Sequence, residues 1–124
     1  MINGVHAIVY SPQADSVRAF LRDVLGWPAV DAGGGWPIFA LPPAELAVHP
    51  SDGDSRHELY LMCDDIGSTL AELRSKGVEV TTDIADQRWG LVAGIALPDG
   101  AELMIYEPRH PSPLRDEGSR RAEF

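Results

Sequence analysis

Cysteine is almost absent from this sequence, and so are the segments that would direct the chain to a membrane. The single cysteine, Cys63, excludes an internal disulfide and is typical of the reducing cytoplasm. No apolar run approaches the roughly 20 residues that a membrane-spanning helix needs. The first residues also lack the basic flank and apolar stretch of a signal peptide. We therefore expect a cytoplasmic protein with no membrane partner.

Positive charge is scarce as well. The chain has 10 Lys and Arg residues against 19 Asp and Glu residues, which gives a formal net charge of −9. Nucleic-acid binding needs cations that replace counterions on the phosphates, so this balance argues against DNA or RNA as a partner. The apolar share of 44% and the charged share of 23% are ordinary for a globular protein. A chain of 124 residues is long enough for one domain with its own core.

An internal repeat divides the body of the chain into two modules. Residues 40–49 resemble residues 96–106, apart from a turn that is one residue longer in the second copy. Each copy follows an alternating apolar run and an amphipathic helical pattern that ends near a glycine. The predicted boundaries are 1–108 for a single domain, about 1–52 and 53–108 for its modules, and 109–124 for a loosely ordered tail with prolines and mixed charge.

The periodicity predicts the order βαβββ in both modules, with glycines that close the helices. The expected elements of the first module are strands at Val5–Tyr10, Pro28–Asp31, Trp36–Leu41 and Glu45–His49, and a helix through Val17–Leu25 before Gly26. Those of the second are strands at Glu58–Cys63, Val78–Thr82, Leu91–Leu97 and Ala101–Tyr106, and a helix capped by Asp64 or Asp65 that ends at Gly77.

This order of elements resembles the vicinal-oxygen-chelate (VOC) superfamily of glyoxalases, bleomycin-resistance proteins and extradiol dioxygenases. Three local features carry the resemblance: His6 in the opening strand, the segment Glu58–Asp65, and the turn Leu97–Gly100 before the last strand. The resemblance covers about residues 2–108 and implies an α+β fold in which two modules form a curved mixed sheet. It leaves the function open, because the superfamily includes isomerases, dioxygenases, thiol transferases and proteins that only bind a drug.

Strand alternation predicts a helix-covered face and a concave face. The aliphatic residues Val5, Ala7, Val9, Leu46, Val48, Leu59, Leu61, Leu103 and Ile105 are assigned to the helix-covered face. The concave face mixes His, Glu, Tyr and Met, which is too polar for a core and suits a flat, partly apolar ligand. The predicted ligand-binding residues are His6, Tyr10, Trp36, His49, Glu58, Tyr60, Met62, Trp89, Glu102, Met104 and Tyr106. His110, in the predicted tail, is assigned no role.

The resemblance also implies metal-ligand positions, which are occupied here by His6, Ala47, Glu58 and Met104. His6 and Glu58 are good donors for a divalent ion. Ala47 cannot ligate, and a methionine thioether suits these ions poorly. Two donors do not hold a catalytic metal, so we expect no cofactor, with a divalent metal as the alternative. A site of His6, His49 and Glu58 would need a slipped or bulged strand.

Three functional hypotheses follow. The favoured one is a protein of the bleomycin-resistance type that sequesters an aromatic natural product or antibiotic. The first alternative is a divalent-metal-dependent lyase, isomerase or dioxygenase that uses His6 and Glu58. The second is a metal-free enzyme in which Glu58, its pKa tuned by His6, is a general base; equally, His6 and Glu58 could form a structural pair. The resemblance further implies a homodimer, and leaves open whether the pocket lies within one chain or across two.

Overall fold

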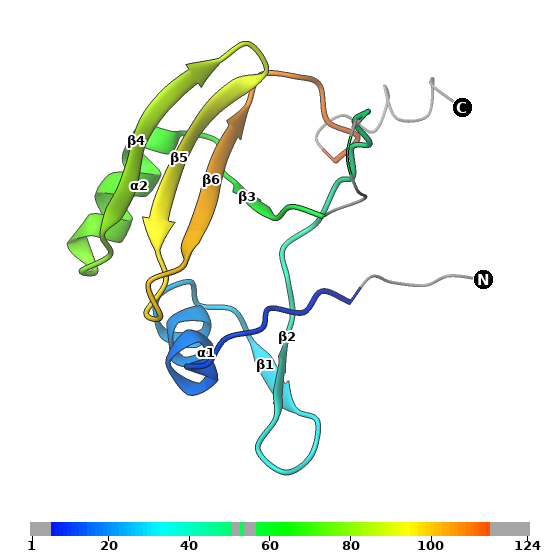
Figure 1. Ribbon diagram of the computed structural model, residues 1–124, viewed down its shortest axis with the longest axis vertical. Helices are drawn as coiled ribbons and strands as arrows, with labels where there is room; N and C mark the ends of the chain where they lie inside the picture. The colour runs from blue at the N-terminus through cyan, green and yellow to red at the C-terminus, as the bar shows by residue number, and fades with distance from the viewer. Residues whose placement is uncertain (1–5, 51–52, 54–56, 115–124) are drawn as a thin grey trace.

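The strands form a mixed sheet in the computed structural model, which describes residues 6–50, 53 and 57–114 (Figure 1). The elements are α1 (Ala14–Asp23), β1 (Ala29–Asp31), β2 (Pro37–Phe39), β3 (Tyr60–Met62), α2 (Ile66–Ser75), β4 (Val80–Gln87), β5 (Gly90–Ala96) and β6 (Glu102–Pro108). One sheet has the order β3-β6-β5-β4, with β3 parallel to β6 and the other pairs antiparallel. The strands β1 and β2 form a separate hairpin. The predicted α+β class with a curved mixed sheet is confirmed.

Helix α2 begins and ends where the sequence predicts. Asp65 is its N-cap and accepts a hydrogen bond from the backbone N–H of Ser68 at 3.0 Å. A second N-terminal donor, the N–H of Ile66, donates to the Glu107 carboxylate of β6 at 2.8 Å. Gly77 follows the helix with φ of +83°, a conformation that other residues adopt only at a cost. The helix is therefore fixed to β6 at its first turn.

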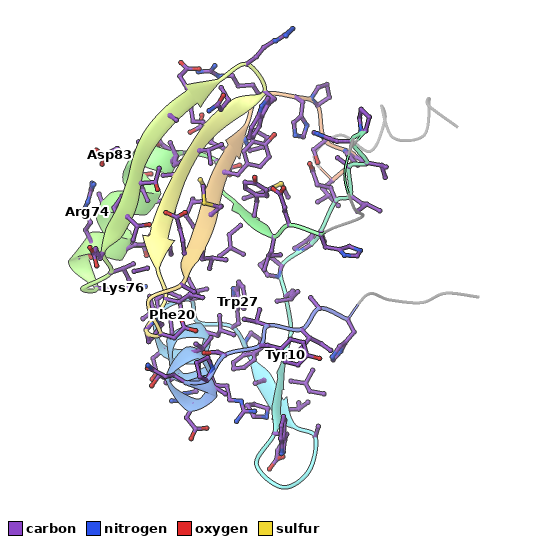
Figure 2. The ribbon with its side chains drawn as sticks, viewed as in Figure 1. Tyr10, Phe20, Trp27, Arg74, Lys76 and Asp83 are labelled. Carbon is purple, nitrogen blue, oxygen red and sulfur yellow. The ribbon has the colours of Figure 1, made fainter. Side chains whose placement is uncertain are left out.

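The core lies between α2 and one face of the four-stranded sheet. The side chains of Ile66, Leu70 and Ile95 are the largest that are fully enclosed. Phe20 of α1 joins this core from below the lower end of the sheet (Figure 2). Leu61, Leu103 and Ile105 also contact it, as predicted for the helix-covered face. The second module therefore has a buried face and a separate concave face.

The helix and the hairpin predicted in the first half are present as α1, β1 and β2, but two other segments depart from the prediction. Residues 6–10 and 45–49 are extended but form no strand, and the assignment of their aliphatic side chains to a buried face is wrong. Leu46 and Val48 are each 89% exposed, and Ala7, Val9 and Leu59 are exposed too. The physical reason is that a strand needs backbone partners, and these segments pair with no strand in the described part of the chain. Val5 lies outside the described residues.

Several strand boundaries differ from the prediction, and that of β4 differs most. Strand β4 runs to Gln87, five residues beyond the predicted Thr82, because residues 85–87 pair with residues 90–92 of β5 after two irregularities in the register. In the predicted tail, Ser112 is buried and its hydroxyl donates to the Glu45 carboxylate. The division into modules stays a prediction. The loosely ordered tail also stays a prediction, since residues 115–124 lie outside the described chain. No helix among the described residues is long and apolar enough to cross a bilayer.

Candidate functional site

The concave face of the four-stranded sheet is built around β6. Its residues Glu102, Met104 and Tyr106 alternate with Leu103 and Ile105, which face the core. The parallel register with β3 sets Tyr60 opposite Met104 and Met62 opposite Tyr106. These five polar, aromatic and thioether side chains lie on the face predicted for ligand binding. Whether they bind a ligand stays a prediction.

Tyr106 is the centre of an aromatic group at one end of this face. Its ring lies 6.0 Å from that of Tyr60 and 5.2 Å from that of Trp89, both in edge-to-face geometry. The ring of His110 lies 5.7 Å away on a tilted plane. Tyr106 is 9% exposed, and its hydroxyl donates to the carbonyl of Trp89 at 3.3 Å. Trp89 remains 46% exposed, so the group offers an accessible ring beside a fixed one.

Two glycines of β5 make room for the side chains of β6. A Cβ at Gly90 would lie 2.5 Å from the Tyr106 ring and 2.5 Å from the carbonyl oxygen of Glu107. A Cβ at Gly94 would lie 2.3 Å from the Glu102 carboxylate. The glycines are four residues apart, and so are Glu102 and Tyr106. Both β6 side chains therefore lie across β5 in the same direction, toward β4.

Glu102 reaches β4 by this route. The hydroxyls of Thr81 and Thr82 each donate to its Oε2 atom at 2.6 Å. These hydrogen bonds lower the pKa of Glu102 below its ordinary value, because they stabilise the charged form. The carboxylate is therefore ionised at neutral pH. The concave face has an anionic end at Glu102 and an aromatic end at Tyr106.

The two residues of the predicted metal pair lie outside the strands of the described chain. His6 is exposed on the N-terminal segment, and Glu58 accepts a hydrogen bond from the hydroxyl of Tyr60 at 2.7 Å. Within residues 6–50, 53 and 57–114, no three His, Cys, Asp or Glu side chains are grouped as a metal site requires. The donor set at the four family positions does not fit a divalent ion, because Ala47 offers no donor and Met104 only a thioether.

Three other predicted residues lie apart from the four-stranded sheet. Tyr10 is 88% exposed on the N-terminal segment (Figure 2), and His49 is exposed near the end of the extended segment. Trp36 precedes β2, and the guanidinium of Arg18 lies 4.9 Å from its ring centroid. The single chain therefore does not bring these residues to the aromatic group.

Several neighbours of this face were not predicted from the sequence. His110 was assigned to the tail, but the turn after β6 returns its ring to Tyr106. Thr81 and Thr82 are adjacent, and strict alternation would have sent one of them to the other face. The matching four-residue spacings in β5 and β6 are a signal that the sequence does contain. It can be interpreted only once the hairpin register is known, with Gly94 opposite Met104.

The single chain does not enclose the concave face. Two hollows of the described chain have volumes of about 230 and 280 Å³. The first lies on the β1–β2 hairpin, and the second lies between α1 and the start of β4. Neither includes Tyr60, Met104 or Tyr106. Trp89 and Glu102, at the two ends of the concave face, are exposed, so a ligand there would contact solvent.

Cys63 shows no sign of nucleophilic chemistry. Partial burial raises the pKa of its thiol, which opposes formation of the reactive thiolate.

The chain was compared with protein families, with curated proteins and with solved structures. The family model of the Glyoxalase/Bleomycin resistance protein/Dioxygenase superfamily matches residues 5–105. No curated protein matches the chain significantly in sequence.

Three solved structures illustrate the likeness, and at these identities they show the fold alone. TnmS3, an antibiotic binding protein from Streptomyces sp. CB03234, has 23% identity and a TM-score of 0.63 over 86% of this chain and 97% of its own. Lactoylglutathione lyase from Agrobacterium tumefaciens has 15% identity and a TM-score of 0.61 over 85% and 92%. A superfamily member from Sphaerobacter thermophilus DSM 20745 has 23% identity and a TM-score of 0.56 over 86% and 98%.

Proposed function

We propose that this chain, which belongs to the Glyoxalase/Bleomycin resistance protein/Dioxygenase superfamily, binds a flat, partly apolar small molecule on the concave face and sequesters it without chemistry. The ligand class is an aromatic natural product or antibiotic. A cytoplasmic location, expected from the single cysteine, is part of this proposal.

The aromatic group is the observation that carries the proposal. Tyr106 is fixed between Tyr60 and Trp89, and Met104 extends the apolar surface along β6. Aromatic rings offer a large contact area to a flat ligand at little conformational cost, and thioethers add a polarisable surface that adapts to its shape. The hydrogen-bonding groups nearby are few and fixed, as in sites that orient a ligand. The fold likeness to TnmS3, an antibiotic binding protein, supports this class of ligand.

A second copy of the chain completes the site in this proposal. Residues 6–10 and 45–49 have the alternating pattern of strands, and exposed aliphatic side chains such as Leu46 and Val48 need cover. Among the described residues the sheet ends at β3 on one side and β4 on the other, and the edge of a sheet is where a further strand can be added. A two-fold dimer would bring a partner to residues 6–10 and 45–49 and to the edge strands β3 and β4. It would also add a second wall to the concave face.

A binding experiment tests the proposed function. Thermal-shift screening of aromatic natural-product antibiotics should find a compound that stabilises the protein, because a ligand bound only by the native state raises its apparent stability. Titration of the best compound should then show weaker binding by Tyr60→Ala, with a modest loss of stability. If Tyr60→Ala binds the compound as tightly as the parent chain, the concave face is not the site.

Light scattering at micromolar concentration tests the dimer. The proposal predicts twice the 13.4 kDa of one chain. Val48→Asp should shift the mass toward one chain, because a charge would oppose burial of this segment. A mass of one chain for the parent protein would overturn the dimer.

Elemental analysis separates this function from a metal-dependent one. Protein purified without chelator should carry no stoichiometric divalent metal, since the donor set does not fit one. About one equivalent of Zn, Ni, Mn or Fe per chain, lost on His6→Ala, would contradict a binding-only function.

A further inference from the structure

Glu102 lies at the opposite end of the concave face from the aromatic group. Tyr106 is four positions further along β6, which corresponds to about 13 Å along the strand. Met104 lies between them and is only partly buried. A ligand that followed β6 would therefore meet rings at one end, a thioether in the middle and a carboxylate at the other end.

Three features hold this carboxylate in place. Gly94 leaves the space in which the Glu102 side chain crosses β5. The irregular pairing between Val80 and Thr82 allows the consecutive hydroxyls of Thr81 and Thr82 to reach the same side of the sheet. Both hydroxyls donate to Oε2 of Glu102. The other carboxylate oxygen, Oε1, accepts no hydrogen bond from the described residues. An ionised oxygen accepts several hydrogen bonds, so the carboxylate keeps capacity for a ligand.

We propose that Glu102 determines specificity on the concave face and selects ligands that carry a cationic nitrogen at one end of an extended, partly aromatic body. This inference rests on the proposed function, because it needs a ligand on that face. A carboxylate that is already positioned loses little side-chain entropy when it binds a cation. Glu102 is exposed, so water screens the charge and the selectivity is about three- to tenfold.

A purely structural role makes a different prediction. If Glu102 only ties β6 to β4 across β5, its replacement would lower stability and leave ligand preference unchanged. The general negative charge of the protein makes a third prediction, in which any exposed acid contributes to the attraction of a cation. Asp83 serves as the control for that effect. It is exposed on the edge strand β4, at the outer side of the sheet (Figure 2).

Three fluorescent probes of matched shape test the inference. Dansylcadaverine carries a naphthalene ring and a primary amine at the two ends of a five-carbon linker. Its N-acetyl derivative is neutral, and the dansyl derivative of 6-aminohexanoic acid is anionic. Each probe is titrated into the full chain, Glu102→Gln and Asp83→Asn, and the dansyl emission reports binding. Urea unfolding of each variant establishes that it is folded.

The inference predicts that the amine binds about three- to tenfold more tightly than the neutral probe. Glu102→Gln should remove this preference and Asp83→Asn should preserve it, while the neutral probe binds all three proteins alike. Equal binding of amine and neutral probe by the parent chain overturns the inference and leaves the proposed function standing. An equal loss of preference in both variants also overturns it, in favour of the overall charge. If no probe binds and the antibiotic screen finds no compound, the proposed function fails and the inference fails with it.

Discussion

The two halves of the chain have the same pattern of residues and different structures. Leu103 and Ile105 of β6 are covered by the core. Their counterparts in the repeat, Leu46 and Val48, are each 89% exposed. The difference is the neighbour: β6 lies between β3 and β5, whereas no strand pairs with residues 45–49 in the described chain. Alternating apolar residues thus specify which face is buried only when a partner strand is present.

The largest expected effect tests this contrast directly. Ile105→Ala should lower the free energy of unfolding by about 2–5 kcal/mol, because it leaves a cavity in the core. Val48→Ala, at the equivalent position of the repeat, should change the stability of the isolated chain by less than about 0.5 kcal/mol. Urea unfolding of both variants at concentrations where the chain is monomeric measures the difference. Similar losses would mean that residues 45–49 are packed within one chain.

Substitutions that enlarge a side chain should also affect the stability of the two halves differently. Gly90→Ala should cost about 1–3 kcal/mol, since its Cβ would meet the carbonyl oxygen of Glu107 and the Tyr106 ring. Ala47→Val adds more volume, but on a segment that is exposed in the single chain, and should be nearly neutral at concentrations where the chain is monomeric. Thermal unfolding of the two variants gives the comparison. A neutral Gly90→Ala would show that β5 and β6 approach each other less closely than described.

Neighbouring residues of β3 test the two faces within one strand. Tyr60→Ala should weaken ligand binding with a modest loss of stability. Leu61→Ala should lower the free energy of unfolding by up to about 2–5 kcal/mol, with the lower end expected because Leu61 is only partly buried. Chemical denaturation and ligand titration of both variants are the measurements. The reverse result would mean that the register is shifted by one residue and that every face assignment inverts.

The smallest expected effect is the loss of stability at acidic pH. The pKa values of Asp99 and Glu102 are lowered by the hydroxyls of Ser11 and of Thr81 and Thr82, and that of Asp86 by Arg109. A lowered native pKa means that the native state favours the charged form. These carboxylates therefore contribute to the stability of the native state. Their contribution is complete above the unfolded pKa of about 4 and is lost as the pH falls through the native pKa.

Urea unfolding between pH 7 and pH 3 should therefore show stability falling below about pH 4. Replacement of Thr81 and Thr82 by Val should reduce the slope. Constant or rising stability toward pH 3 would contradict these assignments. The ionised groups belong mainly to the second half, so the acid response should follow the unfolding of the sheet.

The sequence predicts the second half well for a physical reason. In α2, β5 and β6, local pattern, caps and tertiary neighbours agree, so the periodicity of Leu70 and Leu73 or of Leu103 and Ile105 finds the buried side. In the first half the same pattern predicts strands over residues 6–10 and 45–49, which are not strands in the described chain. The role of Gly94 beneath Glu102 depends on hairpin register, and that of His110 on a turn after β6. Neither is a property of local sequence.

Methyl NMR tests the central claim, that the concave face binds the ligand. Protein labelled at the methionine and isoleucine methyl groups is titrated with the tightest-binding antibiotic from the screen. We predict large shifts for Met104 and Met62, with small changes at Ile95 and Ile105 in the core behind the sheet. Shifts confined to the isoleucines, or to Ile38 on the β1–β2 hairpin, would contradict the claim and place the ligand elsewhere.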